Sequence, residues 1–89
     1  MCRSIHTLYN YEPEATDDEV RAAALQYVRK ISGFTKPSQA NVQAFDRAVD
    51  AVTDASRRLL SELVTAAPPR DREAEAARKH ARWLERQAV

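Results

Sequence analysis

Cysteine and glycine are almost missing from this sequence, and it contains no long apolar run. Cys2 is the only cysteine among 89 residues, so an intramolecular disulfide is excluded, and with it a disulfide-stapled scaffold. Gly33 is the only glycine, which argues against a β-rich fold with many tight turns. No window approaches the roughly 18 apolar residues of a membrane span, and the N-terminus lacks the apolar core of a signal peptide. We therefore expect a cytoplasmic protein with no membrane contact.

An excess of charge of one sign is also lacking. Fourteen basic and 13 acidic residues leave a net charge of +1, and the sequence pI of about 7.9 is below that of a typical dedicated DNA-binding domain. The range 70–89 is the most basic part of the chain, with six basic and four acidic residues. This excess is too small for a basic tail, so nucleic acid is not the favoured partner.

Aromatic residues are few, at 7% against 44% hydrophobic residues overall. The core is therefore expected to be thin and built from alanine, valine and leucine. A single domain of 89 residues with such a core is marginal alone, and burying one face against a second copy is a common remedy. We expect one domain over residues 1–89, and a homodimer as its most natural assembly.

The most regular pattern in the chain predicts a long amphipathic helix over residues 38–65. Its apolar positions recur at alternating intervals of three and four residues, with Ser56 in the one gap, which keeps them on one face. These positions are Val42, Phe45, Val49, Val52, Leu59 and Leu63, and Leu60 and Val64 widen the face. This stripe is predicted to form the core, so an aspartate at Val52 or Leu59 is predicted to unfold the domain.

A second helix is predicted over residues 16–32. Thr16 and Glu19 have the spacing of a capping box, in which each side chain bonds the other residue's backbone amide. Gly33 is expected to end the helix in the left-handed conformation. The apolar positions fall on one side, whereas Leu25 points elsewhere. Because the loop to Ser38 is short, the two helices should form an antiparallel hairpin.

The prolines Pro68 and Pro69 must stop the long helix, because proline lacks the amide donor that a helix needs. A third helix is predicted over residues 70–87. Its apolar stripe is nearly all alanine, and Trp83 lies to one side. We expect this helix to dock weakly or to project from the hairpin.

The first 15 residues have no helical period. Apolar and β-branched residues alternate there with polar ones, which predicts an extended arm. We expect the arm to lie as irregular chain over the helices rather than to pair with its copy in a dimer. The predicted fold class is all-α: a helical hairpin with a long central helix, a third C-terminal helix and an extended N-terminal arm.

Two segments resemble a known family. Residues 1–5, Met-Cys-Arg-Ser-Ile, and residues 29–38, Arg-Lys-Ile-Ser-Gly-Phe-Thr-Lys-Pro-Ser, are similar to those of the small bacterial proteins grouped as domain of unknown function 2277. Family members usually have asparagine where this chain has Ser4. The resemblance implies a bacterial cytoplasmic protein without an assigned activity, and it transfers no catalytic residue.

One candidate binding site lies in the loop between the first two helices. Free amides at a helix N-terminus with cations nearby attract phosphate or carboxylate groups. The residues of this candidate anion site are Arg29, Lys30, Gly33, Lys36 and Ser38. The alternative is a solvated loop whose cations only favour the end of the first helix. A nucleic-acid binder would combine these cations with the basic C-terminal helix.

A second candidate is a reactive thiol at Cys2. Arg3, and His6 if it is protonated, would lower the pKa of a cysteine thiol and make it more reactive. The alternative is a small buried side chain under the arm. Cys2 and His6 with His80 also suggest a metal site, but one cysteine and two histidines are few for zinc. We expect no metal and no other cofactor.

No catalytic signature is present. Asp46, Asp50 and Asp54 form a column of carboxylates along the long helix, and such columns are usually a solvated face. We interpret the chain as a non-enzymatic interaction module with a protein partner that the sequence does not identify. Leu25 and Trp83, two large apolar groups outside their helices' core faces, are the expected homodimer contacts.

Overall fold

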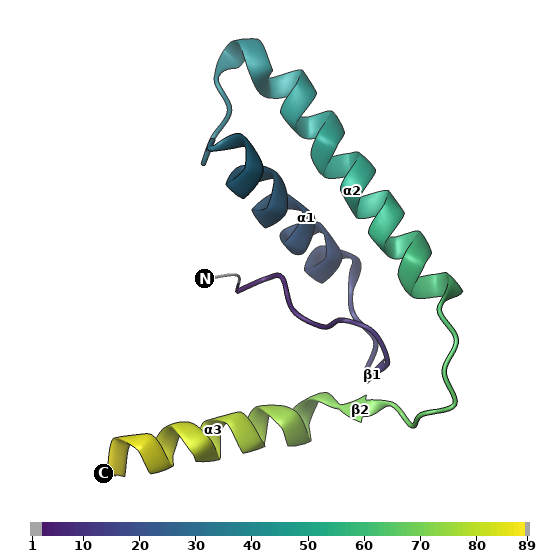
Figure 1. The fold of residues 1–89 in the computed structure, drawn as a ribbon, viewed down its shortest axis with the longest axis vertical. Helices are drawn as coiled ribbons and strands as arrows, with labels where there is room; N and C mark the ends of the chain where they lie inside the picture. The colour runs from purple at the N-terminus through teal and green to yellow at the C-terminus, as the bar shows by residue number, and fades with distance from the viewer. Residues whose placement is uncertain (1–2, 89) are drawn as a thin grey trace.

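The computed structural model describes residues 3–88, which form a mostly helical chain (Figure 1). The helices are α1 (Asp17–Ser32), a short 3-10 turn η1 (Gln39–Asn41), α2 (Val42–Glu62) and α3 (Arg72–Ala88). Two short parallel strands, β1 (Tyr11–Glu12) and β2 (Arg70–Asp71), complete the fold.

Local signals fix both ends of α1. Thr16 Oγ1 accepts a hydrogen bond from the Glu19 amide at 3.2 Å, and the Glu19 carboxylate accepts one from the Thr16 amide at 2.9 Å. At the other end, Gly33 has a φ of 78° and its amide donates to the Arg29 carbonyl at 3.0 Å. A side chain at Gly33 would be strained in this left-handed conformation. The predicted capping box and glycine cap are both confirmed.

The long helix is shorter than predicted at both ends. After Ser38 the chain first makes the 3-10 turn, and the α-helix begins at Val42. The Ser38 hydroxyl accepts from the Asn41 side-chain amide at 2.8 Å and caps no backbone amide. At the C-terminal end, Leu63 is already extended, with a ψ of 142°. The extended chain that follows leads into the two prolines.

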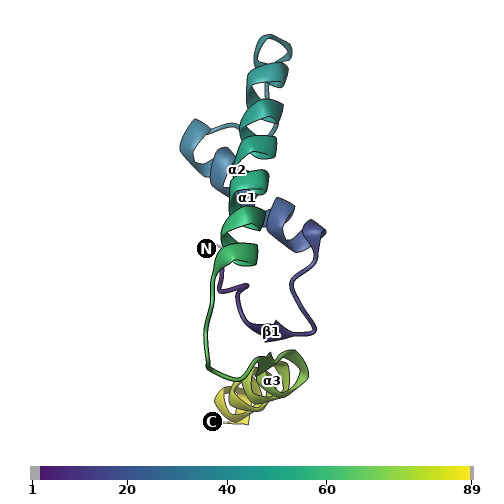
Figure 2. The same ribbon diagram turned by 90° about the vertical axis from the view of Figure 1, so that its right-hand side faces the viewer.

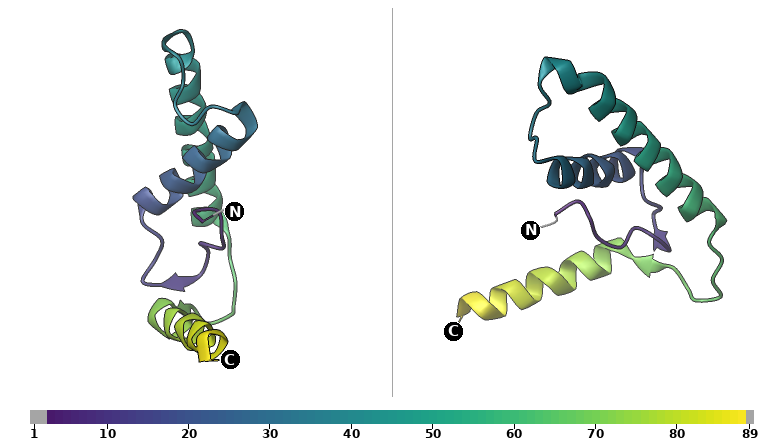
Figure 3. Two further views of the ribbon diagram at one scale, coloured as in Figure 1. Left: turned by 90° about the vertical axis from the view of Figure 1, so that its left-hand side faces the viewer. Right: turned by 45° about the horizontal axis from the view of Figure 1, so that its top comes forward.

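The core lies between α1 and α2, which run antiparallel side by side (Figure 1) and cross obliquely (Figure 3). Its apolar residues are Val20, Ala24, Val28, Phe45 and Val49. Thr53 is also buried, and its hydroxyl donates to the Val49 carbonyl at 2.7 Å, which satisfies the group inside the helix. Thus only the middle of the predicted stripe on α2, from Phe45 to Val52, contributes to the core, and Val42 is 37% exposed.

Two predictions about packing were wrong. Leu25 was expected off the core face, but it packs half-buried against the core cluster. The buried row of α1 runs through every fourth residue, Val20 to Val28, so the packed face is rotated toward Leu25 and leaves Ile31 66% exposed. Leu59, expected in the core, is 56% exposed, because α2 is longer than α1 and continues beyond its partner.

The arm pairs with the chain that precedes α3, so the fold is mostly helical and not purely all-α. The Arg70 amide donates to the Asn10 carbonyl at 2.8 Å, and strand β1 pairs in register with β2. Pro68 and Pro69 keep the preceding chain out of a helix, and Arg70 is the first residue after them with an amide to donate. Sequence reasoning found no partner for a lone strand because this one lies 59 residues away.

Helix α3 projects from the junction with the arm and contains no buried residue. Seen from the side, the molecule is thin (Figure 2), with extents of 48 × 38 × 16 Å. The Cα radius of gyration is 16.4 Å, against about 12 Å for a compact chain of this length. No helix within residues 3–88 has the length and apolarity to cross a bilayer.

Candidate functional site

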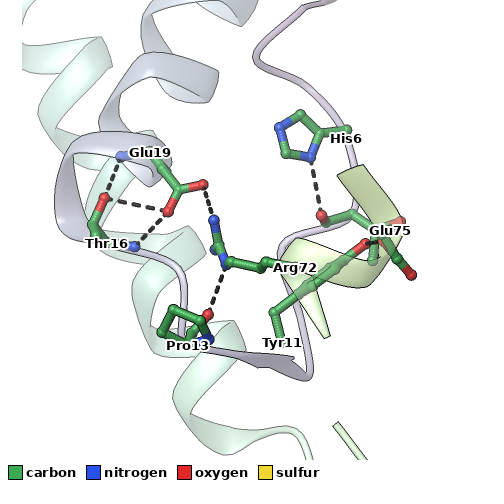
Figure 4. Close-up of polar contacts among 8 residues, drawn as sticks. His6, Tyr11, Pro13, Thr16, Glu19, Arg72 and Glu75 are labelled. Carbon is green, nitrogen blue, oxygen red and sulfur yellow. Dashed lines mark hydrogen bonds and ion pairs between the residues drawn. The ribbon is translucent and has the colours of Figure 1, made fainter. Parts of the chain in front are cut away.

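The arm, α1 and α3 meet at Arg72, the first residue of α3 (Figure 4). Its guanidinium donates to the Pro13 carbonyl at 2.7 Å and to the Glu19 carboxylate at 2.9 Å. The hydrogen bond from Arg72, helped by the Thr16 amide, holds the pKa of Glu19 below its ordinary value. The Glu19 carboxylate therefore makes two contacts: it caps the N-terminus of α1, and it binds Arg72 at the start of α3.

Tyr11 contacts two arginines at the same junction. The guanidinium carbons of Arg70 and Arg72 lie 5.5 and 5.4 Å from the ring centroid, within range of cation–π attraction. The Tyr11 hydroxyl donates to the Glu75 carboxylate at 2.8 Å, and the two side chains point toward each other in Figure 4. Asp71 caps α3, because its carboxylate accepts from the Ala74 amide at 3.0 Å. Tyr11 thus connects the arm to the first turn of α3.

A basic cleft of about 340 Å³ opens beside this junction, between the arm and α3. His6 and Thr7 line it from the arm, together with Tyr11. Its cationic residues are Arg70, Arg78, Lys79 and Arg82, and Glu75 is the only carboxylate among the residues that line it. The positions 78, 79 and 82 fall on one side of α3 by helical spacing. We refer to this site as the basic cleft.

A larger cleft of about 840 Å³ lies between the arm and the C-terminal half of α2. It is lined by leucines and tyrosines, by four carboxylates and by Arg57 and Arg58. Arg57 pairs with Asp17 at 3.1 Å, so one of these two cations is already neutralised. Three carboxylates and one arginine remain outside that pair, so the lining is net negative and does not favour an anion.

The comparisons with known proteins identify a family. A family model described as "Uncharacterized conserved protein (DUF2277)" matches residues 1–78. The chain belongs to this family. The match includes the hairpin and the Tyr11 junction and ends within α3, so Lys79 and Arg82 lie beyond it. No curated protein and no solved structure matches the chain.

The structure leaves the predicted anion site of this family member open to solvent. All five of its residues are exposed, and none of them lines either of the two clefts described above: Arg29, Lys30, Gly33, Lys36 and Ser38. Neither η1 nor α2 has a side-chain cap at its N-terminus. The loop therefore remains a predicted site that belongs to neither cleft.

Cys2, the predicted reactive thiol, lies outside the described residues. Arg3 and His6 are both exposed, and His6 Nδ1 lies 3.0 Å from the Thr7 carbonyl oxygen. His80 stacks on Trp83, with ring centroids 5.8 Å apart. Within residues 3–88, no three histidines and carboxylates gather in a way that would hold a metal ion.

The carboxylate column is partly paired. Asp50 accepts from Arg21 of α1 at 2.8 Å, and this contact raises the pKa of Arg21, with smaller contributions from Asp46 and Asp54. Both side chains of the pair are more than half exposed, so the pair links α1 to α2 weakly. The column thus behaves as a charged outer face of the hairpin.

Sequence reasoning missed the Tyr11 junction and the basic cleft. The spacing of Arg78, Lys79 and Arg82 was visible as a signal, because it places three cations on one side of a helix. Nothing local indicated that the arm would lie against that side. The cleft depends on contacts between segments more than 50 residues apart, such as Tyr11 with Glu75.

Proposed function

We propose that this protein is a non-enzymatic binding module that works as a symmetric homodimer. The observation that carries the proposal is its surface area. The chain exposes 7193 Å², whereas a compact monomer of 10.1 kDa exposes about 5,300 Å². The excess of about 1,900 Å² is more than the roughly 800 Å² that each partner buries in a standard interface. A bacterial cytoplasmic setting stays a prediction of the sequence.

The proposed contact is the apolar side of α3. Its small residues are Ala74, Ala77, Ala81 and Ala88, with Leu84 as the one large aliphatic group. The ring of His80 stacks on that of Trp83, three residues further along α3. His80 also precedes Leu84 by four residues, so the two rings widen the apolar side of the helix. We call this whole set the α3 stripe: Ala74, Ala77, His80, Ala81, Trp83, Leu84 and Ala88. Small side chains let two helices approach closely, and a two-fold axis would pair the stripe with itself.

The interface differs from the sequence-based expectation in one residue. Trp83, 47% exposed, stays in the proposed contact. Leu25 leaves it, because this side chain already packs against the hairpin core. A substitution at Leu25 would disturb folding and would not report on association.

Sedimentation equilibrium at tens of micromolar protein tests the dimer. The wild type is expected at twice the 10.1 kDa chain mass. Ala81→Glu places a charge in the middle of the α3 stripe and should give a monomer, because a buried unpaired carboxylate is costly. Ala22→Glu is the control, since Ala22 is also an exposed alanine on a helix but belongs to α1 and not to the α3 stripe.

The control should keep the dimeric mass. A monomeric wild type at the highest concentration would overturn the proposal. Equal dissociation by Ala22→Glu and Ala81→Glu would show that the contact does not use the stripe.

A further inference from the structure

The basic cleft holds positive charge without matching negative charge. None of the ion pairs formed among residues 3–88 uses Arg78, Lys79 or Arg82. Arg78 and Arg82 are four residues apart on α3, a spacing at which like charges repel. Such an arrangement lowers the stability of the free chain slightly, and an anion in the cleft would remove the repulsion.

Glu75 is the residue best placed to neutralise these cations, but it is engaged elsewhere. It precedes Lys79 by four residues, the favourable order for an ion pair within a helix. Its carboxylate instead accepts the Tyr11 hydroxyl at 2.8 Å. The contact that attaches the arm to α3 therefore also leaves Lys79 available to a ligand.

We propose that the basic cleft between the arm and α3 binds a small phosphorylated ligand. Arginine presents a planar fork of donors that matches phosphate oxygens, and lysine adds a mobile positive charge. Several cations around one cleft suit a group with more than one negative charge. His6 and Thr7 on the arm and Arg70 before α3 close the site from the opposite side.

The size of the cleft favours a small molecule. Its volume of about 340 Å³ is at the lower end of the range for small-ligand sites. The cations also occupy a short segment, from Arg78 to Arg82 on α3, rather than a long groove. A phosphorylated metabolite fits this arrangement better than a nucleic-acid strand. The alanines and Leu84 of the α3 stripe lie on a different side of the helix, whereas Trp83 follows Lys79 by four residues and adjoins the cleft.

Titration of ¹⁵N-labelled wild-type protein with pyrophosphate, followed by amide chemical shifts, locates the site without any variant. The largest shifts are expected at Thr7 and at residues 75–82. Inorganic phosphate should shift the same amides with weaker affinity, because it carries less charge. Shifts centred on residues 33–40 would place the anion at the helix-connecting loop and overturn the proposal.

Two double variants test the affinity. Lys79→Gln with Arg82→Gln should weaken pyrophosphate binding about tenfold or more, because two charge-assisted contacts are lost. Arg29→Gln with Lys30→Gln removes the same charges from the end of α1 and should change the affinity by less than about twofold. Glutamine is a good helix former, so both double variants should fold, which far-UV circular dichroism checks.

Equal weakening in the two double variants would overturn the proposal, because it would show nonspecific attraction to net charge. Short single-stranded RNA provides a further comparison at the same ionic strength. RNA that binds more tightly than pyrophosphate, with a steep loss of affinity as salt rises, would overturn the small ligand in favour of nucleic acid.

Discussion

The guanidinium of Arg72 lies 2.9 Å from the carboxylate of Glu19, and this pair connects the first residue of α3 to the first turn of α1. Both side chains are less than a third exposed. The same carboxylate accepts the Thr16 amide at 2.9 Å. A single acidic side chain therefore caps one helix and orients another helix 53 residues further along the chain.

Glu19→Gln is expected to lower the midpoint of thermal unfolding at neutral pH by a few degrees. The glutamine amide oxygen keeps an acceptor for the Thr16 amide, but the charge that pairs with Arg72 is lost. The folded-state pKa of Glu19 lies below its ordinary value of 4.5, so its contribution is present above that pH. The contribution disappears as the pH falls through the folded-state value.

The gap between wild type and Glu19→Gln should therefore shrink when the melts are repeated in acid. Differential scanning calorimetry across this pH window measures the effect. A gap of the same size at neutral and at acid pH would contradict an electrostatic role for the pair with Arg72.

Tyr11→Phe is expected to loosen the junction between the arm and α3. The variant keeps the ring beside the two arginines and removes the hydroxyl, which donates to Glu75 at 2.8 Å and accepts from Arg70 at 3.5 Å. Loss of about 1 kcal/mol should speed hydrogen exchange of the Arg70 amide about fivefold, because this amide donates to Asn10 across the junction. Tyr9→Phe is the matched control, because the structure gives the Tyr9 hydroxyl no hydrogen bond within residues 3–88. Equal acceleration in the two variants would refute the role of the Tyr11 hydroxyl.

The two halves of α2 should respond differently to truncation. Val49 is 2% exposed in the core, so Val49→Ala should lower the free energy of unfolding by about 2 kcal/mol. Leu59→Ala should change it by no more than about 0.5 kcal/mol, because Leu59 projects into solvent beyond α1. Urea denaturation followed by circular dichroism measures both values. Equal losses would place Leu59 in the core after all.

Aspartate substitutions at Val52 and Leu59 test the same difference between the two halves of α2. Val52→Asp should unfold the chain, because Val52 packs against the core cluster. Leu59→Asp should keep its helical circular dichroism and a cooperative melt, contrary to the expectation from the sequence pattern alone. An unfolded Leu59→Asp variant would restore that expectation.

Trp83 is the only tryptophan, and its fluorescence should report on association. In the proposed dimer the indole is buried, so dilution should shift its emission to longer wavelength as the dimer dissociates. Ala81→Glu should emit at the longer wavelength at every concentration, and Ala22→Glu should follow the wild type. Emission independent of concentration in the wild type would count against Trp83 as an interface residue.

The ends of α1 could be predicted because their signals are local. Thr16, Glu19 and Gly33 satisfy backbone groups that lie within four residues of them, and no distant contact changes that requirement. The end of α2 before Pro68 was predictable for the same reason, although the helix ends at Glu62, a few residues earlier than expected. The exact face of α1 was not predictable, because packing against α2 determines how far Leu25 turns inward.

By itself, the sequence determined a mostly helical chain, an antiparallel hairpin and a thin core, since these follow from apolar spacing, capping and the scarcity of large apolar residues. Only the tertiary structure decided where the arm lies and what Glu75 binds. Glu75 had a local partner in Lys79 and took a distant one in Tyr11. The physical reason is that a parallel pairing of Tyr11 with Arg70 brings the arm onto α3. No pattern in either segment specifies a contact between residues so far apart in the chain.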